Sequence, residues 1–190
     1  MMIIIISNPI RLKDEEEIIG RLFEEGLEIF HLRKKTYSES EVRTFIENLQ
    51  EQNFKKIVLH SHYNLAKEYG LRGVHVAQTF KGENQGGTLS YSFHSLEEIQ
   101  LFGRNYDYVF LSPIFDSISK EGYKSGFNPD EVKVFLKDRK ENIIALGGID
   151  EDNVKIAKEL RFSGIALLGA IWQEKYPVDK YIRIKERWLK

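Results

Sequence analysis

The feature that most constrains the fold is a regular alternation of short apolar runs with longer amphipathic segments. The first run, residues 3–7, is a continuous β-branched stretch typical of a strand covered on both faces. Residues 14–25 follow, with apolar side chains at helical spacing among acids. The pattern then repeats, with strands expected at 27–32, 56–60, 73–76, 88–93, 108–111, 142–146 and 164–168, and helices at 38–50, 63–69, after Ser95, 129–137, 150–160 and 178–189.

This alternation predicts parallel strands joined by helical crossovers, which is the α/β class. Eight strands would close into a single (β/α)8 TIM barrel. The link 80–87 is too short and too rich in glycine for a full helix. The alternative is a doubly wound open sheet, but residues 7–10 after the first strand lack its glycine-rich fingerprint. With no linker or repeat in view, we expect residues 1–190 to form one domain.

Composition excludes several classes of function. The chain has 28 Lys and Arg against 29 Asp and Glu, so no net field would attract nucleic acid or an anionic membrane, and neither partner is expected. It has 0 cysteines, which excludes disulfides, thiolate metal ligands and a cysteine nucleophile. The opening run is too short to span a bilayer and lacks the features of a signal peptide, so we expect a cytoplasmic protein.

Polar residues collect where the expected strands end, which is where TIM barrels build their active sites. All 5 histidines lie in or beside these ends, and Ser112 closes the sixth strand. For His62 and His75 we favour a structural role, capping a helix or satisfying a buried carbonyl. Three histidines could also bind Zn²⁺, but their regular spacing follows from the fold, and no metal site is predicted.

The ends of the last two strands carry glycines that predict a phosphate site. Gly147 and Gly148 follow the seventh strand, and Leu168 and Gly169 close the eighth. In such barrels this pair of loops commonly binds phosphate through backbone N–H groups, which glycine leaves open to approach. A Gly-Gly pair alone could mark only a turn, but the second glycine at the neighbouring strand end favours a site.

Two further groups complete the expected chemistry. Arg33 and Lys35 occupy alternate positions of an extended segment, so both can face the mouth and, with Lys120, meet an anionic ligand; the alternative is that Lys34 and Lys35 begin a solvated loop. His94 directly precedes a helix start marked by Ser95 and Glu98 at capping-box spacing. A fixed but accessible imidazole suits a proton shuttle, and His94 is therefore the candidate acid/base.

Six motifs, in order along the chain, resemble those of a known family. They lie at residues 30–35, 73–78, 92–98, 108–115, 144–149 and 164–171. Their order and spacing resemble the thiamine phosphate synthase superfamily over nearly the whole chain, and within it the thiazole tautomerase branch.

The resemblance implies two different activities. The synthase joins a pyrimidine diphosphate to a thiazole phosphate with Mg²⁺ held by two aspartates, but the matching positions here are Ser61, beside His60, and Phe80. Neither a hydroxyl nor a phenyl ring replaces a carboxylate toward Mg²⁺. Lys120, after Ser117 and Ser119, does match the synthase's diphosphate-binding segment.

The tautomerase branch needs no metal: it moves a proton within a dihydrothiazole phosphate carboxylate to aromatise the ring. The resemblance places its acid/base at His94 and its His-x-Arg pattern at His31 and Arg33. We therefore expect a cofactor-free isomerase of a small phosphorylated heterocycle. Its substrate-binding residues would be His31, Arg33, Lys35, His60, Ser112 and Lys120, and Gly147, Gly148, Leu168 and Gly169 would bind the phosphate.

Two alternative functions stay open. The chain could be a synthase that uses Mg²⁺ through other ligands such as His60, or an inactive regulator that only binds thiazole phosphate. The family also implies a homodimer, in which Trp172 and Trp188 of the carboxyl-terminal segment could belong to the core or to the interface.

Overall fold

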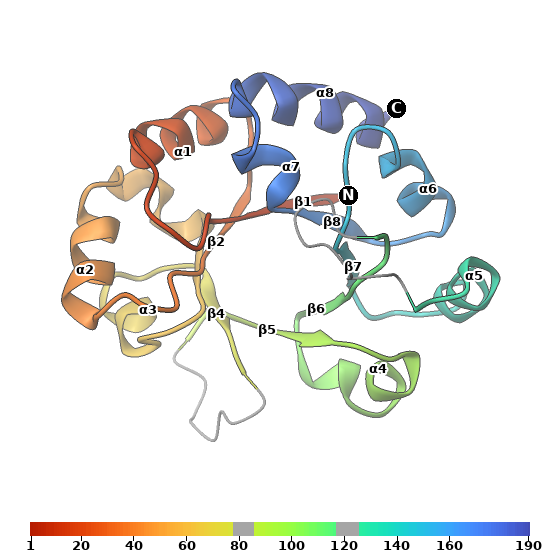
Figure 1. Ribbon diagram of the computed structural model, residues 1–190. Coiled ribbons are helices and arrows are strands. Elements are labelled where there is room, and N and C mark those ends of the chain that lie inside the picture. The colour runs from red at the N-terminus through yellow and green to blue at the C-terminus, as the bar shows by residue number, and fades with distance from the viewer. Residues whose placement is uncertain (78–85, 117–125) are drawn as a thin grey trace.

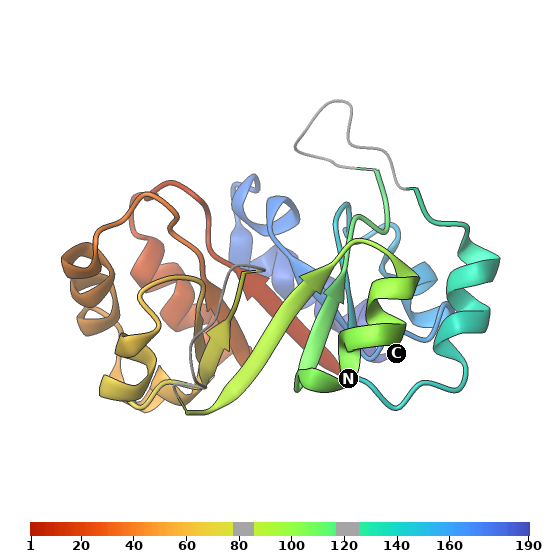
Figure 2. The same ribbon diagram turned by 90° about the horizontal axis from the view of Figure 1, so that it is seen from below.

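Eight parallel strands form a closed barrel in the computed structural model, which describes residues 1–77, 86–116 and 126–190. Neighbouring strands pair in chain order, and β8 closes the barrel by pairing with β1 (Figures 1 and 2). The strands are β1 (Met2–Ile6), β2 (Ile29–Leu32), β3 (Ile57–Leu59), β4 (Gly73–His75), β5 (Thr88–Phe93), β6 (Tyr108–Leu111), β7 (Ile143–Leu146) and β8 (Gly164–Leu167). The predicted (β/α)8 barrel is confirmed.

Helices follow most strands and surround the barrel (Figure 1). They are α1 (Glu15–Glu24), α2 (Glu39–Glu47), α3 (Asn64–Glu68), α4 (Leu96–Phe102), α5 (Pro129–Leu136), α6 (Val154–Glu159), α7 (Gly169–Trp172) and α8 (Pro177–Leu189), with 3₁₀ turns η1 (Glu51–Lys56) and η2 (Gly103–Asn105). Most of the link between β4 and β5, for which no full helix was expected, lies outside the described residues.

Local hydrogen bonds fix where the helices begin. Ser38 is the N-cap of α2, and a full capping box joins it to Glu41. The helix expected from residue 150 begins only at Val154, because the Asn153 side chain holds the preceding loop instead. Its Oδ1 accepts from the Asp150 N–H at 2.8 Å, and its Nδ2 donates to the Gly148 carbonyl at 2.7 Å.

The barrel interior is divided by polarity. Inward residues of β1, β7 and β8 are apolar, including Ile4, Ile144 and Ala166. The polar inward groups come from β2 to β6 and the residues that follow them: His31, His60, His75, Ser90, Ser92 and Tyr108. One half of the barrel thus holds a hydrogen-bonded network where most barrels of this type hold branched aliphatic layers.

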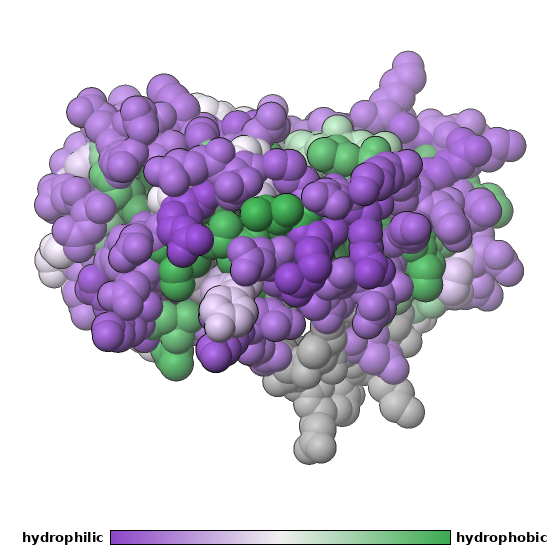
Figure 3. Space-filling model, turned by 90° about the horizontal axis from the view of Figure 1, so that it is seen from above, coloured by the Kyte–Doolittle hydropathy of each residue, from purple (hydrophilic) through white to green (hydrophobic). Residues whose placement is uncertain are grey.

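A larger apolar core lies between the barrel and its helices. Trp172 and Trp188 belong to this core, being 7% and 0% exposed, so neither is available as a surface contact. The outer surface is mostly hydrophilic, as the face over α1 and α8 illustrates (Figure 3). Among the described residues, no helix is long and apolar enough to span a membrane.

Candidate active site at the carboxyl ends of the strands

A cavity of about 560 Å³ opens at the carboxyl ends of the strands. Its wall combines the two halves of the barrel, with aromatic and polar side chains on one side and glycine loops on the other. Of the residues singled out in the sequence, those lining it are Arg33, Lys35, His60, His75, His94, Ser112, Gly147, Gly148, Leu168 and Gly169. Lys120 falls outside the described residues, as do Gln78, Phe80, Ser117 and Ser119.

His94 is held at the mouth by hydrogen bonds on both its backbone and its ring. Its N–H donates to Glu98 Oε2 at 3.1 Å, while Ser95 caps α4 by accepting from the Glu98 N–H. The ring Nδ1 lies 2.8 Å from the carbonyl oxygen of Ser112. A carbonyl can only accept, so Nδ1 carries a proton, and in the neutral form of the ring the lone pair is on Nε2. The accessible, fixed imidazole expected from the sequence is thereby present, poised as a base.

The three basic side chains that follow β2 point to two different sides of the barrel wall. Arg33 and Lys35 line the cavity, and within the described parts of the chain neither forms an ion pair. Lys34 points the other way, into a fully buried ion pair with Glu15 at 2.6 Å. Lys34 therefore does not begin a solvated loop. Its neighbours Arg33 and Lys35 face the same side, as expected for alternate positions of an extended segment. Burial lowers the pKa of Arg33, whose guanidinium nevertheless stays charged.

The two glycine loops meet on the opposite wall. Gly147 and Gly148 have φ of +96° and +65°, and a Cβ on Gly148 would lie 2.3 Å from the carbonyl oxygen of Asp116. The glycines are thus required by the neighbouring β6–α5 loop itself. In the parts of the chain that the structure describes, the N–H groups of Gly148, Gly169 and Ala170 donate to no protein acceptor. These N–H groups remain available to an anion.

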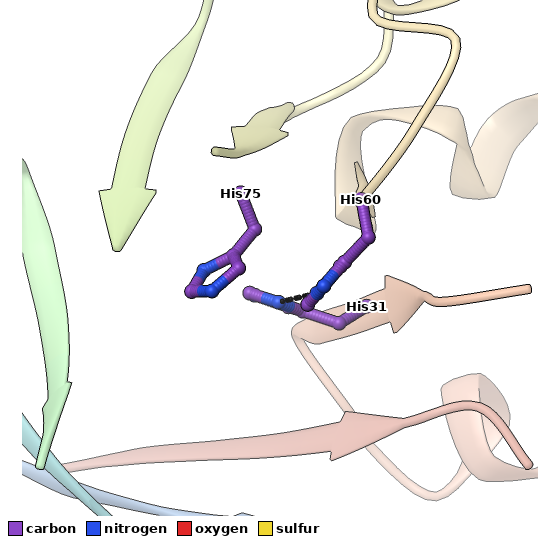
Figure 4. Close-up of side chains that lie close together, drawn as sticks. All are labelled: His31, His60 and His75. Atoms are coloured by element: carbon purple, nitrogen blue, oxygen red, sulfur yellow. Dashed lines mark hydrogen bonds between the residues drawn. The ribbon is translucent and has the colours of Figure 1, made fainter. Parts of the chain in front are cut away.

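Three imidazoles cluster together, those of His60 and His75 in the lining of the cavity and that of His31 below it (Figure 4). His31 Nδ1 lies 2.8 Å from His60 Nε2, and His31 Nε2 lies 2.6 Å from the hydroxyl of Tyr108. His75 stacks on His60 with ring centroids 4.3 Å apart, and its two nitrogens lie 3.0 Å from the hydroxyls of Ser90 and Ser92. Burial lowers the pKa of all three rings, that of His75 to about 3, so each is neutral at physiological pH.

One predicted substrate contact is not supported by this arrangement. His31 is 0% exposed and lies below the cavity lining, because its strand position points into the barrel one layer deeper than His60. Its ring packs against His60, His75 and Phe110, which line the cavity above it, and its hydrogen bond on that side goes to His60. His62, as expected, has a structural role: its Nε2 bonds the carbonyl oxygen of Tyr37 at 2.9 Å. His75 is satisfied by hydroxyls rather than by the carbonyl we expected.

Several lining residues were missed in the sequence. Tyr91, Ser92 and Phe110 line the cavity, and Tyr108 supports His31 from below. For Ser92, Tyr108 and Phe110 the signal was the period of two along β5 and β6, which places every second side chain inside the barrel. Reading those strands residue by residue would have found these three. Tyr91 belongs to the opposite face of β5, where it packs against Phe93 and Tyr106, and the period of two gave no signal for it.

Comparison with known proteins agrees with this geometry. The sequence profile of the thiamine monophosphate synthase family matches residues 2–171. The chain belongs to this family. A thiamine-phosphate synthase from Dictyoglomus turgidum is 24% identical over 148 residues, a match that covers 71% of this chain and 66% of that relative, slightly under two thirds of its length.

Solved structures show the same family fold. A thiamine phosphate pyrophosphorylase from Bacteroides thetaiotaomicron is 30% identical, with a TM-score of 0.87 over 98% of this chain and 97% of the other. The corresponding Pyrococcus furiosus protein is 18% identical, with a TM-score of 0.84 over 99% and 95%, and supports the fold alone. The family assignment places the chain in thiamine biosynthesis.

Proposed function

We propose that this member of the family is a metal-independent thiazole tautomerase acting on a dihydrothiazole phosphate carboxylate. The observation that carries the proposal is the tautomer of His94. With Nδ1–H donated to the Ser112 carbonyl, Nε2 is free to accept a proton at the cavity mouth.

The other groups bind and orient the substrate. The N–H groups of Gly148 and Gly169, which donate to no acceptor among the described residues, would hold the phosphate, and Arg33 or Lys35 would meet the carboxylate. The proton then moves in two steps. His94 Nε2 accepts a carbon-bound proton, and the C–H electron pair enters the conjugated system of the ring and carboxylate. The imidazolium returns the proton at the far end of that system, which leaves an aromatic ring and consumes no oxidant.

The donor set does not suit the Mg²⁺ that the synthase reaction requires. Among the described lining residues there is no aspartate or glutamate, and the position after β3 offers His60 and Ser61 instead. Mg²⁺ binds carboxylate and water oxygens in octahedral geometry, whereas neutral imidazoles suit other metals. No step of the proposed reaction therefore passes through a metal.

Replacing His94 with Gln tests the assignment. The variant should lose about 10²–10⁴-fold in kcat, the usual contribution of a positioned acid/base. Binding of the thiazole phosphate carboxylate product, followed by calorimetry, should change little. The control is His62→Asn, whose ring lies on a loop and bonds only the Tyr37 carbonyl among the described residues. A wild-type protein that binds the product but never turns over substrate would instead be an inactive binder.

The second candidate is a thiamine phosphate synthase. The names of the relatives that match in sequence and structure favour it. This reading requires diphosphate release from the pyrimidine substrate and hence strong charge stabilisation of the leaving group. Product formation that depends strictly on Mg²⁺ would support it and would mean that other ligands replace the two aspartates.

A further inference from the structure

The buried imidazoles of His31 and His60 form a chain that begins at Tyr108 and ends at the cavity. Tyr108 is 4% exposed and His31 0%, whereas His60 is partly accessible and lines the cavity. The chain therefore connects a fully buried hydroxyl to the ligand space through two hydrogen bonds of 2.6 and 2.8 Å. His60 is the one member that a ligand can touch.

The direction of these hydrogen bonds follows from the chemistry of the groups. A phenol is a stronger acid than a neutral imidazole N–H, and the hydroxyls of Ser90 and Thr88 act on the Tyr108 oxygen as donors, so we assign the Tyr108 proton to the hydrogen bond with His31 Nε2. His31 then carries its proton on Nδ1 and donates it to His60 Nε2. A neutral His60 must in turn carry its proton on Nδ1. Burial raises the pKa of Tyr108 to about 12, which keeps the phenol protonated at the head of the chain.

Nδ1 of His60 is the last atom of this chain of hydrogen bonds. No hydrogen bond joins it to another described residue, yet it is not among the fully buried polar atoms without a partner, which in the described chain are Arg72 Nε and Trp188 Nε1. His60 itself is half-buried and lines the cavity, so Nδ1 is the ring nitrogen left to meet a ligand there. Its N–H is a hydrogen-bond donor for which the described residues supply no acceptor.

A bound metal ion explains the arrangement of the three imidazoles less well than hydrogen bonding does. One ion bound by two imidazoles must lie close to both ring planes, about 2.0–2.1 Å from each nitrogen. The rings of His60 and His75 are stacked at 25°, so their planes do not meet near the nitrogens. Both nitrogens of His75 are already bonded to serine hydroxyls. The His31–His60 contact of 2.8 Å is likewise a hydrogen-bond distance.

We propose that His60 is an N–H donor to the substrate carboxylate, held in the Nδ1-protonated tautomer by Tyr108 through His31. This inference rests on the proposed tautomerase function. When His94 removes the carbon-bound proton, negative charge grows on the carboxylate oxygens, and a fixed N–H donor stabilises it without transferring its own proton. A neutral donor suits this task because its proton is kept while the charge develops. His31 and Tyr108 are positioning residues that touch no substrate.

The tautomer can be measured without any substrate. Long-range ¹H–¹⁵N NMR reports which nitrogen of each of the 5 histidines is protonated, and single-histidine variants assign the signals. We expect His60 to be protonated at Nδ1, and Tyr108→Phe to give a mixture of tautomers at His31 and His60. Tyr106→Phe is the matched control, since Tyr106 packs against Tyr91 and Phe93 and contacts none of the three imidazoles. Protonation of His60 at Nε2, or no change in Tyr108→Phe, would overturn the inference.

Kinetics then tests the role. His60→Phe should lower kcat for aromatisation about 10²-fold with little change in binding of inorganic phosphate, as loss of one charge-stabilising donor does. Tyr108→Phe should lower kcat about tenfold without raising KM, and Tyr106→Phe should leave both unchanged. Unaltered turnover in both site variants, or one equivalent of Zn²⁺ held by the three histidines and required for turnover, would refute the role. A wild-type protein without aromatisation would refute the proposed function while the tautomer result still stood.

Discussion

At the residue scale, function depends on which atom of each side chain the fold leaves free. His94 and His60 both line the cavity, but the hydrogen-bond partners of their rings differ in kind. A carbonyl oxygen fixes the proton of His94 on Nδ1, so this ring offers a lone pair. In the proposed tautomer of His31, a donated N–H makes Nε2 of His60 an acceptor, so this ring would offer a proton at Nδ1. Two identical side chains thus take opposite roles because their neighbours differ.

Gly148 gives a prediction at this scale. Gly148→Ala should destabilise the protein by at least ~1–3 kcal/mol, because φ is +65° and the new Cβ would lie 2.3 Å from the Asp116 carbonyl oxygen. It should also weaken phosphate binding, since the loop must move. Gly126→Ala is the control: a Cβ there meets nothing within 4 Å, and urea unfolding should show little change. Equal stability of the two variants would contradict this account of the loop.

At the element scale, the buried Lys34–Glu15 pair joins the end of β2 to the start of α1. Both side chains are 0% exposed, and Lys34 Nζ also donates to the Ile10 carbonyl at 2.8 Å. Burial raises the pKa of Glu15 and lowers that of Lys34, which shows that both charges are unfavourable in this environment. Removing either partner would leave the other as an unpaired buried charge. By fixing Lys34 on the helix side, the pair keeps Arg33 and Lys35 on the cavity side.

Lys34→Met should therefore reduce the free energy of unfolding by about 3–5 kcal/mol, the cost typical of breaking a buried ion pair. The double variant Glu15→Gln/Lys34→Met should recover most of this loss, because no unpaired charge remains. Urea unfolding measures both. A single variant as stable as wild type, or a double variant no better than the single one, would show that the pair does not hold this segment.

At the scale of the whole molecule, three neutral imidazoles inside the barrel couple stability to pH. The folded pKa values of His31, His60 and His75 lie below the unfolded value of about 6.5, so the unfolded state binds more protons. Stability is then complete above pH 6.5 and is lost as pH falls below it. Each buried histidine contributes about 1.4 kcal/mol of loss per pH unit in this window.

Urea unfolding at pH 7.5 and pH 5.5 checks this coupling. The wild-type protein should lose several kcal/mol between the two, and His75→Gln should lose less by about one histidine's share. His62→Asn, on a loop outside the cluster, should keep the wild-type dependence. A stability that does not change over this pH range would mean that the three rings are not held neutral.

Much of the fold could be predicted because each signal was local. The short apolar runs and the helical stripes specify eight strands and most of the helices between them, and Ser38 and Ser95 mark helix starts by their own side-chain chemistry. The strand-end rule also located His94, Arg33 and the glycine loops. The depth of His31 and the partner of Lys34 could not be predicted in this way. Both depend on contacts between residues 77 and 19 positions apart, which only the closed barrel brings together.

The most direct test of the account is an assay of the purified protein after treatment with EDTA. It follows aromatisation of the dihydrothiazole phosphate carboxylate without metal and, in parallel, coupling of the pyrimidine diphosphate to thiazole phosphate with Mg²⁺ restored. We predict aromatisation without metal and no coupling in either condition. Coupling that appears only with Mg²⁺, with no aromatisation, would contradict the account and identify the protein as a synthase.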